Sequence, residues 1–285
     1  MSSMNTNNVT MLGPTAEAPG RTRPPESKRP QKRVGLTSRK NVPYGLVSIV
    51  VGLLLWEVLV RSLQPSRLVI VAPSEILVRL AEMFSTGEIW RDLSISLQAF
   101  GIGYGLAAVV AIPLGLAIGA SPLVHKWANP WVNALYATPI IGLAPLLIII
   151  FGFGLTAKAA VVIALVIFPI LINTVSGARA VGADHKELAI VYKASRIETF
   201  VRVLFPGSIP FILTGLRLAV GRGLIGVVVA DLFGASAGLG LNLQRSAQAF
   251  NTVDIFAVTV LLAALGILLS AVLEYFERRA YGGVK

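Results

Sequence analysis

The stretch ELAIVYKASRIETFVRVLFP, residues 187–206, is a polar and basic segment that separates two long apolar runs of the chain. Four of its positions recur at the helical spacing i, i+3, i+4 and i+7: Leu188, Val191, Tyr192 and Ser195. This spacing predicts a helix with one mostly apolar face and one charged face, which suits docking against a partner. Periodicity alone leaves a second interpretation open, in which the segment rests on the bilayer surface.

The segment resembles the loop that membrane subunits of ATP-driven ABC importers insert into a cleft of the cytoplasmic ATPase. That loop reads EAA, three residues, Gly, nine residues, Ile, any residue, Leu-Pro. The spacing is the same here, and Lys193 takes the place of the glycine that bends the loop. The resemblance implies ATPase-coupling roles for Glu187, Leu188, Ala189, Val191, Tyr192, Lys193 and Pro206.

A second resemblance covers residues 213–243, which are similar to permeases for nitrate, sulfonate, taurine and related organic anions. Together the two resemblances imply the type I ABC importer permease fold over about residues 44–280. They imply a homodimer, a cytoplasmic ABC ATPase and a periplasmic or lipid-anchored solute-binding protein. ATP would bind the ATPase subunit, and this chain would bind no cofactor. The substrate would be a small organic or inorganic anion.

Composition predicts a membrane protein without any motif. The chain has 285 residues, of which 55% are hydrophobic and 14% charged, and its mean hydropathy is +0.75. These values are too apolar for an ordinary soluble domain. There is no cysteine, and the two histidines, His125 and His185, are far apart in the sequence. A metal site is therefore not expected.

Six apolar runs are each long enough to cross a bilayer, which needs about 20 residues. We therefore predict an all-α, polytopic membrane protein with six transmembrane helices. The predicted spans are 44–63, 95–120, 130–153, 157–178, 207–232 and 253–275.

The positive charges predict the orientation of these spans. With the N-terminus inside, seventeen Lys and Arg residues flank the cytoplasmic side and six, including Lys158, flank the outer side. Short basic loops remain cytoplasmic. We therefore expect a multi-pass protein of the inner membrane with both termini, and the segment 187–206, in the cytoplasm.

Residues 1–42 form a separate compositional unit, which is rich in Ser, Asn, Thr, Pro and Gly and carries eight basic residues. This composition predicts a disordered cytoplasmic tail ahead of a transmembrane permease domain at 43–285. Its apolar run begins too late for a secretory signal peptide. Basic charge beside a span is explained more simply by topology and lipid attraction than by nucleic-acid binding.

Prolines and glycines interrupt the third predicted span at Pro139, Gly142 and Pro145, and Pro169 interrupts the fourth. Irregular backbone at membrane depth is tolerated where it is buried in protein or lines a cavity. A translocation path near Tyr136 is therefore plausible. A kink that only improves helix packing is the alternative.

The fifth span carries charged residues at membrane depth. Arg217 is near enough to the cytoplasmic end to extend back to the interface, which indicates a structural role. Arg222 is deeper and must face the bundle interior, water or an anion. We predict that it lines an anion path, and the open alternative is that it caps carbonyls freed by a proline. Asp231 lies about 13 Å further along the helix, too far for direct pairing. The predicted path residues are Tyr136, Pro139, Arg222 and Asp231.

Smaller patterns predict packing. Gly101 with Gly105 and Gly115 with Gly119 form G-x-x-x-G spacings, which allow close helix approach. Glu57 and Arg61 are expected to pair at i, i+4. A surface helix is expected after an N-cap at Pro73 and Ser74.

Two other classes of function stay open from the residues alone. Broken spans and buried charge also fit an ion-coupled secondary transporter, although no inverted repeat is evident. A membrane-embedded enzyme is disfavoured because no nucleophile–base or metal constellation is present. The sequence has no G-x-x-x-x-G-K-[ST] motif for ATP.

Overall fold

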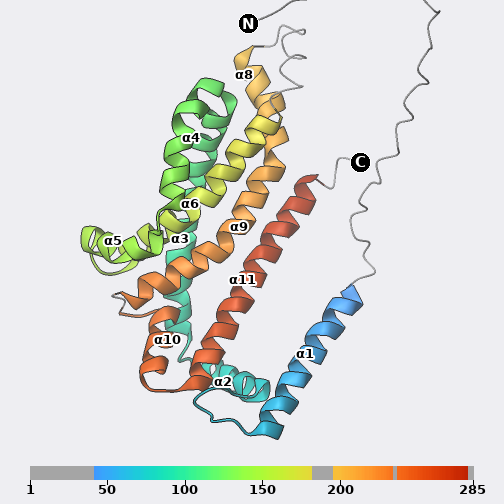
Figure 1. Cartoon of the computed structure of the whole chain (residues 1–285), viewed down its shortest axis with the longest axis vertical. Helices are drawn as coiled ribbons and strands as arrows, with labels where there is room; N and C mark the ends of the chain where they lie inside the picture. The colour runs from blue at the N-terminus through green and yellow to red at the C-terminus, as the bar shows by residue number, and fades with distance from the viewer. Residues whose placement is uncertain (1–41, 182–194, 234–235, 282–285) are drawn as a thin grey trace, which may run out of the picture. The chain divides into compact units, whose positions relative to one another are not determined.

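The structure is a computed structural model that describes residues 42–181, 195–233 and 236–281 (Figure 1). All secondary structure in these ranges is helical. The helices are α1 (Val42–Leu63), α2 (Pro73–Ser85), α3 (Trp90–Ala120), α4 (Pro122–Ala137), the 3₁₀ helix η2 (Ile140–Leu143), α5 (Ala144–Phe151), α6 (Leu155–Ala180), α8 (Arg196–Thr199), the π-helix η3 (Phe200–Leu204), α9 (Phe205–Leu232), α10 (Leu239–Gln248) and α11 (Thr252–Tyr281). The chain divides after Ser48, and all packing below lies within residues 49–285.

Within the described residues, four helices are long and apolar enough to cross a membrane. They are α3, α6, α11 and the continuous stretch Ile197–Leu232, which includes α9. A fifth candidate is the pair formed by α4 and the segment Ile140–Phe151, which bends by 76° at its break. An all-α polytopic membrane protein is thus confirmed, whereas the count of six spans stays a prediction.

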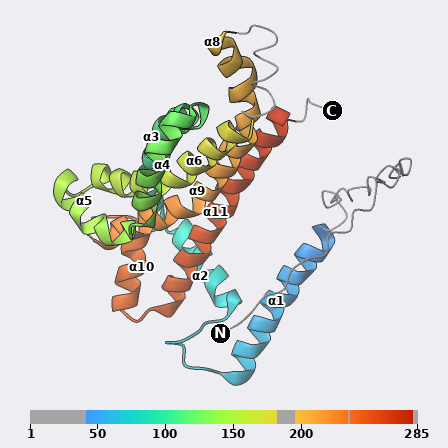
Figure 2. The same cartoon turned by 45° about the horizontal axis from the view of Figure 1, so that its top comes forward.

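The core is built around α6, which packs extensively against α3 on one side and α9 on the other. These three helices lie side by side in both views (Figures 1 and 2). Fourteen of the 26 residues of α6 are buried. Its apolar side chains Val162, Val166 and Ile170 meet Phe100 of α3 and Val220 of α9.

Small residues let α3 approach α6 closely. A Cβ built on Gly115 would lie 2.6 Å from the Thr174 Cβ, and one on Gly119 would lie 2.5 Å from the Ala178 Cβ. The predicted packing role of this pair of glycines is confirmed. The pair Gly101 and Gly105 has no neighbour within 4 Å of such a Cβ among the described residues. The same spacing therefore marks a closed interface once and an open face once.

The bundle has two ends. The α8 end holds α8, η3 and the C-terminus of α6, whereas the α10 end holds α2 and α10 against α11 (Figure 2). Near the α8 end, Arg217 of α9 forms an ion pair with Glu277 of α11. This pair agrees with the structural role predicted for Arg217.

Three local predictions change. Pro169 does not break its span, because α6 continues through it from Leu155 to Ala180. Ser74 does not cap α2, since Ala72 is the N-cap residue and the Ser74 hydroxyl donates to Glu57 instead. Glu57 also forms the predicted ion pair with Arg61, at 2.5 Å.

The third change concerns Lys158, which the charge count treated as an outer loop residue. Lys158 lies within the first turn of α6 and is 4% exposed. Its charge is neutralised inside the protein, so it was wrong to count it as a topology signal. The orientation predicted from the remaining charges does not change.

Candidate functional site

The third predicted span breaks at the residues that the sequence singled out. Helix α4 ends at Ala137, Thr138 is extended, and Pro139 is the N-cap of η2. Backbone groups at the break are satisfied locally: Thr138 N–H donates to Leu135 O and Gly142 N–H to Pro139 O. The break thus places the last turn of α4, with Tyr136, at the start of a bend without needing a distant side chain.

Arg222 of α9 extends to this last turn of α4. Its Nη2 donates to the Tyr136 hydroxyl oxygen at 2.9 Å, and its Cζ lies 5.2 Å from the centroid of the Tyr136 ring. Phe168 of α6 supports the ring from a centroid distance of 6.2 Å. Three helices therefore contribute to one site, and two of the predicted path residues, Tyr136 and Arg222, are brought together.

Arg222 is exposed, and none of the ion pairs among the described residues includes it. A guanidinium offers five N–H donors and cannot lose its charge in a protein. One phenol oxygen satisfies a small part of this capacity. The carbonyls at the proline break already have backbone partners, which weakens the capping alternative for Arg222.

Asp231 lies apart from this site, in a closed arrangement. It is 0% exposed, and its Oδ1 lies 2.5 Å from Lys158 Nζ. Its Oδ2 accepts the Gly240 N–H at 3.0 Å and the Ser96 hydroxyl at 3.5 Å. The structure thus supports Asp231 as an internal counter-ion and does not bring it together with Tyr136, Pro139 or Arg222.

The same cluster fixes the chain that leads into α10. Lys158 Nζ donates to Ala237 O at 2.5 Å, and Gly238 N–H donates to Asp92 Oδ1 at 2.8 Å. Leu239 N–H donates to Ser96 Oγ at 2.9 Å. Gly238 has a φ of +140°, and an added Cβ there would collide with the Asp231 carboxylate. Sequence reasoning missed Lys158, Ser96 and Asp92, although the glycines of GASAGLG signalled close backbone approach.

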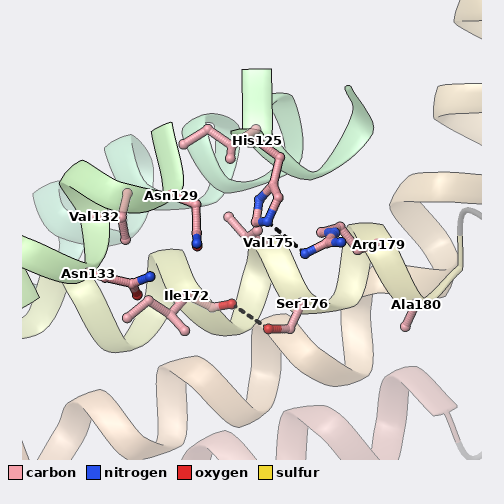
Figure 3. A pocket seen from close by; sticks show the side chains of 10 residues that line it. His125, Asn129, Val132, Asn133, Ile172, Val175, Ser176, Arg179 and Ala180 are labelled. Atoms are coloured by element: carbon pink, nitrogen blue, oxygen red, sulfur yellow. Dashed lines mark hydrogen bonds between the residues drawn. The ribbon is translucent and has the colours of Figure 1, made fainter. Parts of the chain in front are cut away.

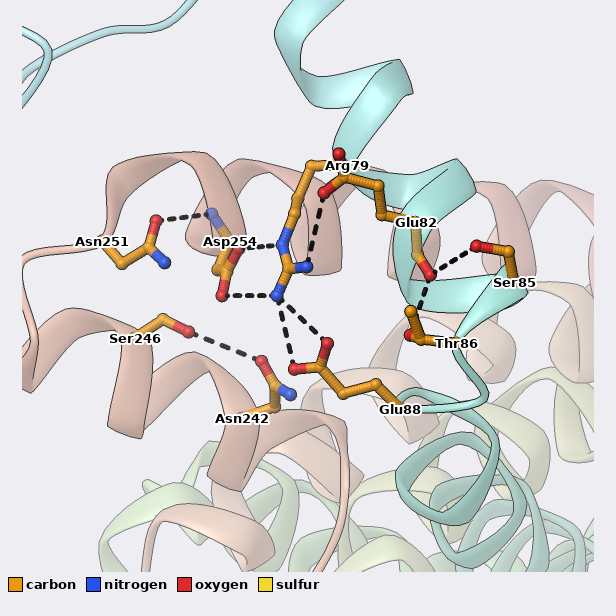
Figure 4. A network of polar contacts seen from close by, with 9 residues as sticks. All are labelled: Arg79, Glu82, Ser85, Thr86, Glu88, Asn242, Ser246, Asn251 and Asp254. Carbon is orange, nitrogen blue, oxygen red and sulfur yellow. Dashed lines mark hydrogen bonds and ion pairs between the residues drawn. The ribbon is translucent and has the colours of Figure 1, made fainter.

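A second polar network ties the α10 end together (Figure 4). Arg79 of α2 forms an ion pair with Asp254 of α11 at 2.6 Å and a second one with Glu88 at 3.2 Å. The hydrogen bond with Asp254 raises the pKa of the Arg79 guanidinium above its ordinary value. Arg79 therefore stays charged and joins the surface helix α2 to a spanning helix.

Most of the predicted coupling segment lies outside the described residues, which resume at Ser195. This applies to Glu187, Leu188, Ala189, Val191, Tyr192 and Lys193. Ser195 begins α8 with a capping box, in which Glu198 N–H donates to Ser195 Oγ and Ser195 N–H donates to Glu198 Oε2. Pro206 follows in the first turn of α9. The S-x-x-E spacing was a readable signal that the sequence analysis did not use.

The fold and its polar sites define a polytopic permease. The family described as "Binding-protein-dependent transport system inner membrane component" matches residues 111–281. The chain belongs to this family.

Relatives support the same class. The formylaminopyrimidine transport permease ThiX of Halalkalibacterium halodurans is 32% identical over 79% of this chain and 89% of its own length. The taurine transport system permease TauC of Escherichia coli is 28% identical over 84% and 89%. The nitrate import permease NrtB of Leptolyngbya laminosa is 27% identical over 86% and 90%.

A solved structure of the MetNI methionine ABC transporter, in inward facing conformations, shares the fold. The match has a TM-score of 0.56 and 17% identity and covers 67% of this chain and 94% of the other. The chain is therefore the membrane permease of an ABC importer, and ATP hydrolysis belongs to a separate subunit. Family membership sets aside the secondary transporter and the membrane-embedded enzyme.

Proposed function

We propose that this permease imports a small anion, such as a sulfonate, taurine or nitrate, and that Arg222 and Tyr136 line its path. The observation that carries the proposal is an exposed guanidinium on a spanning helix that has no carboxylate partner among the described residues. A charge at membrane depth costs at least ~2.5 kcal/mol, so it must face water, protein or an anion.

The geometry of the pair suits an anion. The Tyr136 oxygen accepts from Arg222, so its own hydrogen remains available for donation. Cationic N–H groups and a phenol O–H then face the same space. Charge-assisted hydrogen bonds from such groups to a sulfonate or nitrate oxygen are about twice as strong as neutral ones. Pro139 contributes by ending α4 just after Tyr136.

The relatives favour the same substrate class without deciding it. Two of them are named for taurine and nitrate, both of which carry an oxyanion group, and a third is named for formylaminopyrimidine, which does not. A neutral heterocycle is therefore the second candidate substrate.

A second copy of the chain would cover the open face of α9. Leu218, Arg222 and Ile225 are exposed along one stripe at i, i+4 and i+7. Lipid would not satisfy Arg222 on this face, whereas a path enclosed between two copies would. We therefore propose a homodimer with the path between the copies.

The α8 end is the proposed docking site for the ATPase. Residues 187–193 would enter the ATPase cleft, with Ser195, Glu198 and Pro206 fixing the segment that follows. The excess of basic residues places this end and both termini in the cytoplasm, with the basic tail at 1–42 and with α1 as a sixth span. The solute-binding protein would dock at the α10 end.

Uptake into liposomes tests the path. The permease is reconstituted with its ATPase, and its binding protein delivers labelled taurine, ethanesulfonate, nitrate or formylaminopyrimidine from outside. We expect uptake of an anion, a loss of about tenfold or more in Arg222→Gln, and a smaller loss in Arg222→Lys. Arg278→Gln, which removes an exposed arginine paired at i, i+4, is the matched control. Uptake of formylaminopyrimidine alone, or unchanged anion uptake in Arg222→Gln, would refute the proposal.

Coupling is tested by ATP hydrolysis in the same liposomes. Glu187→Lys reverses a charge in the docking segment, far from the buried core. We expect it to abolish the stimulation of ATPase activity by loaded binding protein while the complex still assembles. Full stimulation in Glu187→Lys and in Tyr192→Ala would show that the segment does not couple the subunits.

A further inference from the structure

A separate cavity of about 450 Å³ lies between α4 and α6, toward the α8 end. Its polar lining comes from His125, Asn129 and Asn133 of α4 and from Ser176 and Arg179 of α6. Figure 3 shows both asparagine side chains directed from α4 toward α6, and His125 and Arg179 directed toward each other. No carboxylate lines the cavity, so its formal charge is positive.

The contact between Arg179 and His125 determines where the hydrogens lie. Arg179 Nη1 is 2.6 Å from His125 Nε2. A guanidinium can only donate, so Nε2 must accept, and the neutral ring carries its proton on Nδ1. That Nδ1 is buried and has no hydrogen-bond partner among the described residues. The imidazole therefore offers one N–H donor that the protein leaves unused.

The remaining groups add donors rather than negative charge. Arg179 keeps further N–H groups, since none of the ion pairs in the described part of the chain includes it. The amides of Asn129 and Asn133 each supply an N–H₂. Ser176 donates its hydroxyl hydrogen to Ile172 O at 2.9 Å. An acceptor-rich, negatively charged group is the ligand that such a cavity would satisfy.

The cavity is in line with the site at Arg222. His125, Asn129, Asn133 and Tyr136 follow one another at intervals of four, four and three residues, which places them on one face of α4. This polar face extends about 16 Å along the helix, from the α8 end to the Tyr136 hydroxyl that Arg222 contacts. One helix face thus connects the two arginines.

We propose that this cavity is a second binding site for the oxyanion group of the imported solute, occupied after the solute leaves Arg222 and before it is released at the α8 end. The inference rests on the proposed function, because it takes the anion and the direction of transport from it. The two arginines then act in sequence, and Asn129 and Asn133 hold the anion without adding charge. An anionic lipid headgroup has the same chemistry and is the alternative occupant.

Inhibition by anion on the release side tests the proposal. Liposomes of phosphatidylcholine are loaded with ATP and increasing ethanesulfonate, and uptake of labelled taurine or nitrate, whichever the panel shows to be imported, is measured from outside. We expect internal ethanesulfonate to inhibit the wild type. Its half-inhibitory concentration should rise about tenfold in Arg179→Gln and severalfold in Asn129→Leu. It should not change in Arg278→Gln.

Two results would overturn the assignment. One is a wild type that internal ethanesulfonate does not inhibit, or an inhibition that Arg179→Gln and Asn129→Leu leave unchanged. The other is a response to phosphatidylglycerol in the liposomes that Arg179→Gln removes while the inhibition stays the same, which would identify a lipid site. Failure of the proposed function is read separately, from unchanged uptake in Arg222→Gln.

Discussion

Arg222 and Asp231 lie nine residues apart on the same helix, α9, and meet opposite conditions. Asp231 is fully buried, its two oxygens contact Lys158, Gly240 and Ser96, and its carboxylate fixes the entry to α10. Arg222 is exposed and contacts one tyrosine. The comparison separates two uses of charge in a membrane protein. A charge that is enclosed and paired stabilises the fold, whereas a charge that is held open is available to a solute.

The largest expected effect comes from opening the closed site. Asp231→Asn leaves Lys158 charged and unpaired in the interior, which costs about 3–5 kcal/mol. We expect the purified complex to lose most of its thermal stability, with Lys158→Met similarly damaging. The double variant, which removes both charges and keeps an acceptor for Gly240 N–H, should recover a large part of the loss. Additive losses in the double variant would show that the two residues are not coupled.

A smaller effect should separate the closed and open glycine pairs of α3. Gly119→Ala places a methyl group against Ala178 and the Val175 carbonyl, an overpacking that costs about 1–3 kcal/mol. Gly105→Ala meets no described neighbour and gains up to about 1 kcal/mol of helix propensity. We expect the melting temperature to fall in the first variant and to stay or rise in the second. Equal changes would mean that α3 and α6 do not pack as described.

The smallest effect is expected at the open site itself. Tyr136→Phe keeps the ring against Arg222 and Phe168 and removes only the hydroxyl. A hydrogen bond of this kind contributes about 0.5–1.5 kcal/mol, so anion uptake should fall by roughly two- to tenfold without loss of stability. A melting temperature that falls with uptake would assign the hydroxyl to the fold instead.

Much of the fold could be predicted because membrane spans are dictated by local composition. Long apolar runs identified α3, α6, α9 and α11, and Pro139 with Gly142 identified the break after α4. Local pairs such as Glu57 and Arg61 were also readable, since helical spacing alone brings them together.

The rest depends on contacts between distant parts of the chain. Lys158 reads as a loop charge until α6 places it beside Asp231, 73 residues later. The two G-x-x-x-G pairs are indistinguishable in sequence, because only the neighbouring helix decides which one is covered. Arg179 and His125 are separated by 54 residues, so their contact carries no sequence signal. Arg222 was found because a charge inside an apolar run is visible without its partner.

The central claim is that α9 carries one structural charge and one transport charge. The most direct test measures thermal stability and anion uptake side by side for Arg222→Gln and Asp231→Asn, in the complex with its ATPase. We predict a wild-type melting temperature with at least about tenfold less uptake for Arg222→Gln, and a clearly lowered melting temperature for Asp231→Asn. A destabilised Arg222→Gln, or an Asp231→Asn that stays stable while uptake is lost, would contradict the account.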